Sequence, residues 1–90
     1  MNDNKMKSLG NFKKAVGQLN KIIDMIEKDQ YCIDVMQQNL AVIGLLRSAH
    51  TLLLEGHLNS CFASGIEAKN SRRKEEIIAE VLKVVKMFNK

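Results

Sequence analysis

The chain has 90 residues and a formal net charge of +4, and it contains neither proline nor tryptophan. This length predicts a single small domain spanning residues 1–90, and a proline-free sequence rich in Leu, Ile, Val, Lys and Glu favours long helices. No apolar run approaches the roughly 18 residues of a transmembrane helix, and the N-terminus lacks the apolar segment of a secretory signal. We therefore expect a cytoplasmic protein with two reduced cysteines, whose basic charge suits nucleic acid without identifying it.

The N-terminal third of the chain predicts an amphipathic helix over about residues 6–28, after a polar segment at residues 1–7 that is expected to be disordered. Apolar residues recur there at intervals of three and four. They are Leu9, Phe12, Val16, Leu19, Ile23 and Ile26. Asp29 then interrupts the pattern, and we expect its side chain to cap the next helix.

The central stretch from Tyr31 to Ile66 predicts one long helix. Twenty of its 36 residues are apolar and only three are charged, so most of its circumference is expected to be buried. At ~1.5 Å per residue this helix is about 50 Å long, whereas a compact domain of this length is only roughly 30 Å across. One copy of the chain cannot cover such a helix, and we therefore expect an oligomer.

The C-terminal part of the chain predicts a third helix after a polar connection at residues 67–71. Ser71 can cap this helix, and its dipole favours Glu75 and Glu76 in the first turns. The apolar stripe of this helix consists of Ile77, Ile78, Val81, Leu82, Val85 and Phe88. Because strand alternation is absent from the sequence, we predict an all-α fold of three helices that assembles as a bundle across subunits.

Two cysteines and a histidine on the central helix are candidate metal ligands. His57 and Cys61 are four residues apart and therefore share a helical face, but Cys32 lies ~37 Å before His57 along the axis. Because a ligand lies only about 2 Å from its metal, Cys32 cannot join the pair within one straight helix. Two antiparallel copies that cross near Gly44 would bring Cys32 of one subunit to His57 and Cys61 of the other.

The chemistry of this donor set is soft. Two thiolates and one imidazole suit three-coordinate Cu(I), whereas zinc requires a fourth ligand. If Asp29 caps the helix, Cys32 falls in its first turn, where the dipole favours a thiolate. The structural alternative remains open, because a buried cysteine often acts as a small hydrophobe and a helical histidine is often simply solvated.

Several segments of the sequence are similar to those of one known family. They are Tyr-Cys-Ile-Asp-Val at 31–35, Gln38, Leu46-Arg47, Leu-Leu-Leu-Glu-Gly-His-Leu-Asn-Ser-Cys at 52–61, and Gly17-Gln18 in the first helix. On these residues the chain resembles the copper-sensing operon repressor (CsoR) family of metal-sensing transcriptional repressors. The resemblance implies an all-helical antiparallel dimer that assembles as a dimer of dimers, without a helix-turn-helix motif.

The resemblance also implies a ligand set. It implies that Cys32 of one protomer binds Cu(I) together with His57 and Cys61 of the partner protomer. Related nickel and cobalt sensors have a histidine in place of Cys61, and persulfide sensors lack the histidine at position 57, so the set indicates the copper branch. Tyr31 and Glu80 are implied to support the site, with a hydrogen bond to the ring nitrogen of His57 that does not bind the metal.

The DNA-binding residues implied by the resemblance are Lys13 and Lys14 on the first helix and Arg47 on the second. The sequence shows no base–nucleophile pair and no phosphate-binding loop, so we expect neither an enzyme nor a small-molecule substrate. The expected function is a Cu(I)-responsive repressor, a homodimer or homotetramer that releases operator DNA when copper binds. The alternative is a thiol-redox repressor of the same fold that joins Cys32 to Cys61 of the partner chain.

Overall fold

A computed structural model describes residues 3–62 and 71–88 of the chain, with the backbone alone for residues 60–62. The described residues form helix α1 (Asp3–Glu27), helix α2 (Cys32–Gly56), a π-helical segment η1 (His57–Phe62) and helix α4 (Ser71–Phe88). These helices, with no strand among the described residues, confirm the predicted all-α class. Two compact units can be distinguished, Met1–Glu55 and Gly56–Lys90, and each is described by itself.

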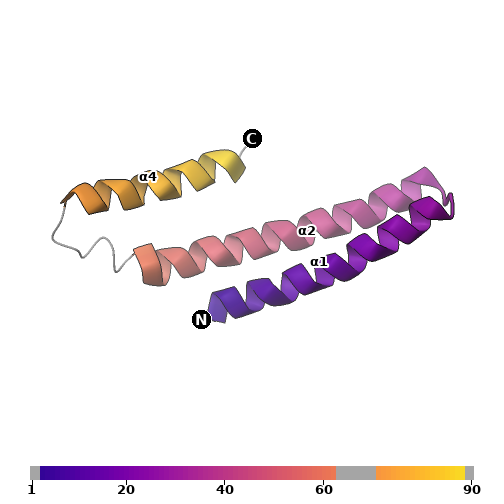
Figure 1. Cartoon of the computed structure of the whole chain (residues 1–90), viewed down its shortest axis with the longest axis horizontal. Helices are drawn as coiled ribbons and strands as arrows, with labels where there is room; N and C mark the ends of the chain where they lie inside the picture. The colour runs from indigo at the N-terminus through magenta and orange to yellow at the C-terminus, as the bar shows by residue number, and fades with distance from the viewer. Residues whose placement is uncertain (1–2, 63–70, 89–90) are drawn as a thin grey trace. The chain divides into compact units, whose positions relative to one another are not determined.

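The first unit is an antiparallel hairpin of α1 and α2 (Figure 1). Helix α1 begins at Asp3, so residues 3–7, which were expected to be disordered, are helical. At the other end, the Gln30 N–H donates to the Met25 carbonyl at 2.9 Å and the Asp29 N–H donates to the Ile26 carbonyl at 3.0 Å. Asp29 has a φ of 54°. This combination is a Schellman motif, which ends α1 and turns the chain back.

The expected role of Asp29 as the cap of the central helix is therefore wrong, because this residue belongs to the end of α1. The carbonyl of Tyr31 instead accepts hydrogen bonds from the N–H groups of Asp34 at 3.0 Å and Val35 at 3.2 Å. Tyr31 is thus the N-cap residue of α2, and Cys32 is the first residue of the helix. Cys32 therefore lies in the first turn of α2, as predicted, but the residue that caps the helix is Tyr31 and not Asp29.

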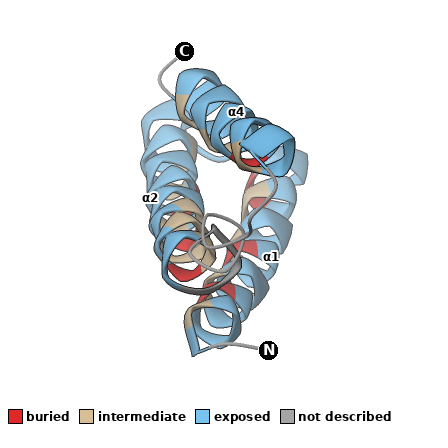
Figure 2. Cartoon of the chain, turned by 90° about the vertical axis from the view of Figure 1, so that its left-hand side faces the viewer, coloured by how far each residue is buried: buried red, intermediate tan, exposed pale blue. Residues whose placement is uncertain are grey.

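The contact between the helices of the hairpin is made by small and medium side chains. Ala15 of α1 and Val42 and Ala49 of α2 are at most 3% exposed. Figure 2 shows buried positions on both helices of the hairpin. Ser8 is also buried, and its hydroxyl donates to the Lys5 carbonyl at 2.7 Å, which satisfies the polar group. Small side chains at this contact allow close approach of the two helices, but they provide little apolar surface to bury.

Two rows of large apolar side chains of the hairpin lie outside this contact, although Met25 is buried. One row on α1, the α1 apolar stripe, is 38–61% exposed and comprises the residues predicted from the sequence: Leu9, Phe12, Val16, Leu19, Ile23 and Ile26. A second row, the α2 apolar stripe, is 39–64% exposed and comprises Ile33, Met36, Leu40 and Ile43. Contiguous exposed apolar rows of this length mark interaction surfaces. The sequence pattern thus identified the face of α1 that the single chain leaves open, whereas the stripe on α2 is seen only in the structure.

The predicted central helix is continuous from Cys32 to Phe62, but its hydrogen bonding changes from α to π at His57. The change follows Gly56, a residue with low helix propensity. Residues 63–66 of the predicted helix lie outside the described residues. In α4, Ile77 is buried and Val81 and Val85 are half-buried, as expected for an amphipathic helix. None of the described helices combines the length and the hydropathy needed to span a membrane.

Candidate metal centre and nucleic-acid interface

Cys32 occupies an accessible position at the start of α2. Its thiol is free and exposed, and the preceding turn places it at the positive end of the helix dipole. The first N–H groups of an α-helix point toward its N-terminus and make up the positive end of the dipole. An exposed thiol at this position is accessible to a soft metal ion or to another thiol.

The second group of predicted ligands lies in the π-helical segment η1. His57 is its first residue and is half-buried, and Cys61 belongs to the same segment. The side chain of Cys61 lies outside the described residues. Single π-helical turns within α-helices occur frequently at functional sites, and here the α-to-π change coincides with the first of the two predicted ligands.

The length of α2 separates Cys32 from this second group. The helix has 25 residues, which corresponds to about 36 Å along its axis. Among the side chains that the structure describes, no three His, Cys, Asp or Glu residues come together in one chain. At this separation, Cys32 and His57 cannot bind one ion along a single straight helix.

The two predicted supporting residues are both on the surface. Tyr31 is 69% exposed, beside Cys32. Glu80 on α4 lies 3.9 Å from the guanidinium of Arg73, which also pairs with Glu76 at 3.3 Å. The pair of Glu80 with Arg73 is long and exposed, and such pairs hold a side chain weakly. Glu80 therefore remains available to form a stronger hydrogen bond elsewhere.

The three predicted DNA contacts lie on different faces of the hairpin. Lys13 and Lys14 are exposed on α1, and as neighbours they point about 100° apart around the helix axis. Arg47 is exposed on α2, two turns after Leu40, and thus continues the line of the α2 apolar stripe. The structure therefore does not gather the three side chains into one patch within a single chain.

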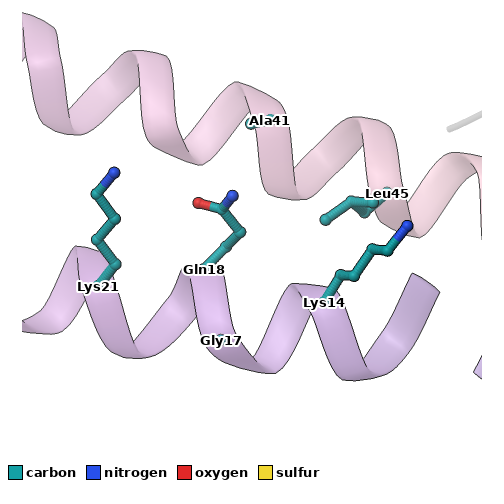
Figure 3. Close-up of a pocket in the computed structure, with 6 residues that line it drawn as sticks. All are labelled: Lys14, Gly17, Gln18, Lys21, Ala41 and Leu45. Atoms are coloured by element: carbon teal, nitrogen blue, oxygen red, sulfur yellow. The ribbon is translucent and has the colours of Figure 1, made fainter. Parts of the chain in front are cut away.

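A shallow pocket of about 580 Å³ lies between α1 and α2, and it was not anticipated from the sequence. It is lined by Lys14, Gly17, Gln18, Lys21, Ala41 and Leu45 (Figure 3). The side chains of both lysines and of Gln18 extend from α1 toward α2 (Figure 3). The Gln18 Oε1 atom is buried and accepts no hydrogen bond within the described part of the chain. No pattern within a single helix points to this pocket, because residues of both helices line it.

Comparison with known proteins identifies the family of this chain. The family model for metal-sensitive transcriptional repressors matches residues 4–87. The copper-sensing transcriptional repressor CsoR of Mycobacterium ulcerans is 41% identical over 66 residues, which cover 73% of this chain and 56% of that protein. The protein of the same name from Bacillus subtilis is 36% identical over 78 residues, which cover 87% of this chain and 74% of that protein. The chain thus spans little more than half of the mycobacterial relative.

A solved structure agrees with the whole chain. The crystal structure of the copper-sensing repressor CsoR with Cu(I) from Geobacillus thermodenitrificans superposes with a TM-score of 0.86 at 30% identity, and the match covers 100% of this chain and 91% of that one. The fold, the family model and the relatives together confirm the resemblance noted from the sequence. The chain belongs to the metal-sensitive transcriptional repressors, a family of regulators and not of enzymes.

Proposed function

We propose that this protein is a Cu(I)-responsive transcriptional repressor that releases operator DNA when Cu(I) binds between two protomers. Cys32 of one protomer and His57 and Cys61 of the partner would hold the ion. The observation that carries the proposal is the position of Cys32, exposed at the first residue of α2, with His57 immediately beyond the last residue of that helix. The copper-sensing relatives and the Cu(I)-bound neighbour support copper as the ligand.

The donor set fits Cu(I) better than the common alternatives. Two sulfur donors and one imidazole nitrogen are soft or intermediate ligands, which suit Cu(I) with three-fold coordination. Structural zinc is almost always held by four ligands. When bound, Cu(I) would supply coordinate bonds that link the ends of two α2 helices.

The apolar stripes supply the assembly that this site requires. Burying the large side chains of the α1 and α2 apolar stripes against a second copy removes them from water, at roughly 1 kcal/mol for each half-exposed Leu or Ile. We propose an antiparallel homodimer, in which the start of α2 in one chain meets the segment after α2 in the other. Two such dimers would form the homotetramer implied by the family resemblance. As an operator-binding repressor, it would act in the cytoplasm.

Glu80 links the proposed site to helix packing. A histidine that binds a metal through one ring nitrogen usually donates the other N–H to a carboxylate or carbonyl, which fixes the ring. We assign Glu80 of α4 as this acceptor for His57, with Tyr31 as a supporting residue beside Cys32. A change of partner from Arg73 to His57 would move Glu80 and therefore favour a different position of α4.

Operator DNA and Cu(I) must then change each other's binding affinity by the same factor. If Cu(I) lowers operator affinity by a given factor, operator DNA lowers Cu(I) affinity by the same factor, and typical couplings of ~1–3 kcal/mol correspond to about 5–150-fold. Lys13, Lys14 and Arg47 are the residues that we assign to DNA. Their contacts would be mainly to phosphates, and the binding should therefore be sensitive to salt.

An anaerobic Cu(I) titration with a competing chelator tests the proposal, with binding to the DNA upstream of the protein's own gene followed in parallel by anisotropy. The expected result is one Cu(I) per chain and a loss of DNA affinity that is complete at the same stoichiometry. Tight Cu(I) binding without any change in DNA affinity would refute the sensing function.

The exposed thiol of Cys32 also favours a second candidate, a thiol-redox repressor that pairs Cys32 with Cys61 of the partner chain. His57→Ala separates the two, because it removes a copper ligand and leaves both sulfurs in place. A copper sensor loses its response to Cu(I) in this variant. A redox sensor keeps its response to an oxidant or a persulfide donor.

A further inference from the structure

Four lysines recur at intervals of seven residues along the first helix: Lys7, Lys14, Lys21 and Lys28. Seven residues are almost two α-helical turns, so these side chains lie on one face, about 10.5 Å apart along the axis. All four are exposed. We call Lys7, Lys14 and Lys21 the lysine ridge, because Lys28 differs from them in its pairing.

The charges of the lysine ridge are uncompensated within the chain. Lys28 pairs with Asp24 at 2.9 Å, whereas the three ridge lysines form no ion pair with any residue of the described ranges 3–62 and 71–88. The arginines of the other basic cluster, Arg72 and Arg73, both pair with Glu76. The lysine ridge is therefore a face of the described chain at which a row of positive charges is free to meet a polyanion.

The ridge stays accessible in the proposed dimer. Lys14 lies two residues from Phe12 and from Val16, and two residues correspond to about 200° around an α-helix. Lys21 has the same relation to Leu19 and Ile23. The lysine ridge therefore faces away from the α1 apolar stripe, and a second copy that covers the stripe leaves the ridge open.

The pocket beside the ridge provides room for a bulky polyanion. It lies between Lys14 and Lys21, where Gly17 has no side chain and a Cβ atom built on it would have no neighbour within 4 Å (Figure 3). On the α2 side, the pocket is lined by the small side chain of Ala41. A phosphate group can thus approach the helix backbone at Gly17, beside Lys14 and Lys21.

We infer that the lysine ridge is a contact surface for the phosphate backbone of duplex DNA, in which Lys21 and Lys7 take part together with Lys14. This inference rests on the proposed function and extends it to residues outside the predicted set. Duplex DNA carries one negative charge for about every 1.7 Å of its axis, so a row of three ammonium groups has several phosphates within reach when it lies against the duplex. Such contacts give affinity and salt dependence and carry no base sequence.

The test uses the full-length, copper-free protein and a fluorescein-labelled 30-base-pair duplex of fixed mixed sequence. Anisotropy titrations between 50 and 200 mM salt compare Lys21→Gln with Lys86→Gln, which removes the same charge from an exposed position on α4. Each lysine–phosphate interaction that is lost should reduce the slope of log K against log salt by about 0.9. For every chain whose Lys21 contacts the DNA, affinity should therefore fall about 3.5-fold less over this range. Lys86→Gln should keep the wild-type slope.

Equal slopes for Lys21→Gln and Lys86→Gln would overturn the inference, provided that both variants keep the wild-type circular dichroism spectrum. Tighter binding of single-stranded DNA of the same length than of the duplex would also overturn it. If the wild-type protein bound no DNA under any of these conditions, the proposed function would fail as well. If wild-type DNA binding responds to Cu(I) but Lys21→Gln has no effect, the lysine ridge is not a DNA contact surface and the proposed function stands.

Discussion

The dimer interface can be tested at Leu40, which is 64% exposed at the middle of the α2 apolar stripe. Full burial of a leucine side chain contributes ~2 kcal/mol, so burial of the part still exposed contributes about 1.3 kcal/mol. Leu40→Ala should retain only a small part of this. Because a two-fold symmetric dimer contains the change twice, the expected loss is about 2 kcal/mol, or roughly 30-fold in the dimer dissociation constant.

Sedimentation equilibrium of the copper-free protein at several concentrations measures this loss. Ser48→Ala is a suitable control, since Ser48 is exposed on α2 but lies one residue, about 100°, beyond the line of the stripe. It should change the dissociation constant by less than twofold. A wild-type protein that is monomeric at micromolar concentration, or a Leu40→Ala variant that associates like the wild type, would show that the stripe does not form the interface.

Three further predictions concern the turn, the hairpin contact and the metal site. Asp29→Gly should stabilise the protein by up to about 1 kcal/mol in urea denaturation, because glycine adopts the φ of 54° without a steric penalty, and an unchanged or lower stability would contradict this. Ala49→Leu should cost ~1–3 kcal/mol in the same assay, since Ala49 is 0% exposed, and a variant as stable as the wild type would contradict a close contact there. Glu80→Gln should weaken Cu(I) affinity about 10-fold without changing the stoichiometry, whereas Glu75→Gln on the same helix should not; equal effects would remove Glu80 from the site.

The fold was largely predictable because the apolar periodicity of each helix is strong. The row from Leu9 to Ile26 and the density of apolar residues after Tyr31 predicted two helices and a surface that a single chain does not cover. The helix boundary at Asp29 was not predictable in the same way. Aspartate is common both at helix N-caps and in left-handed C-terminal positions, and only the backbone hydrogen bonds distinguish the two.

The sequence indicated which residues form the candidate site, but it did not predict the local backbone structure around them. The separation of Cys32 from His57 follows from helix geometry alone, since α2 is as regular as expected. The π-helical segment at His57 depends on hydrogen bonds that no side-chain pattern specifies. The pocket beside Lys14 and Lys21 depends on the small residues of two different helices, and single-helix periodicity does not describe such a contact.

The central claim, that each metal site is shared between two chains, is tested most directly by mixing two inactive variants. Cys32→Ala and His57→Ala homodimers each lack a ligand in both sites, but a mixed dimer has one intact site, formed by Cys32 of one chain and His57 and Cys61 of the other. After unfolding and refolding of an equimolar mixture, random pairing should restore about one quarter of the wild-type Cu(I) capacity. A mixture that binds no more tight Cu(I) than the separate variants would contradict the shared site.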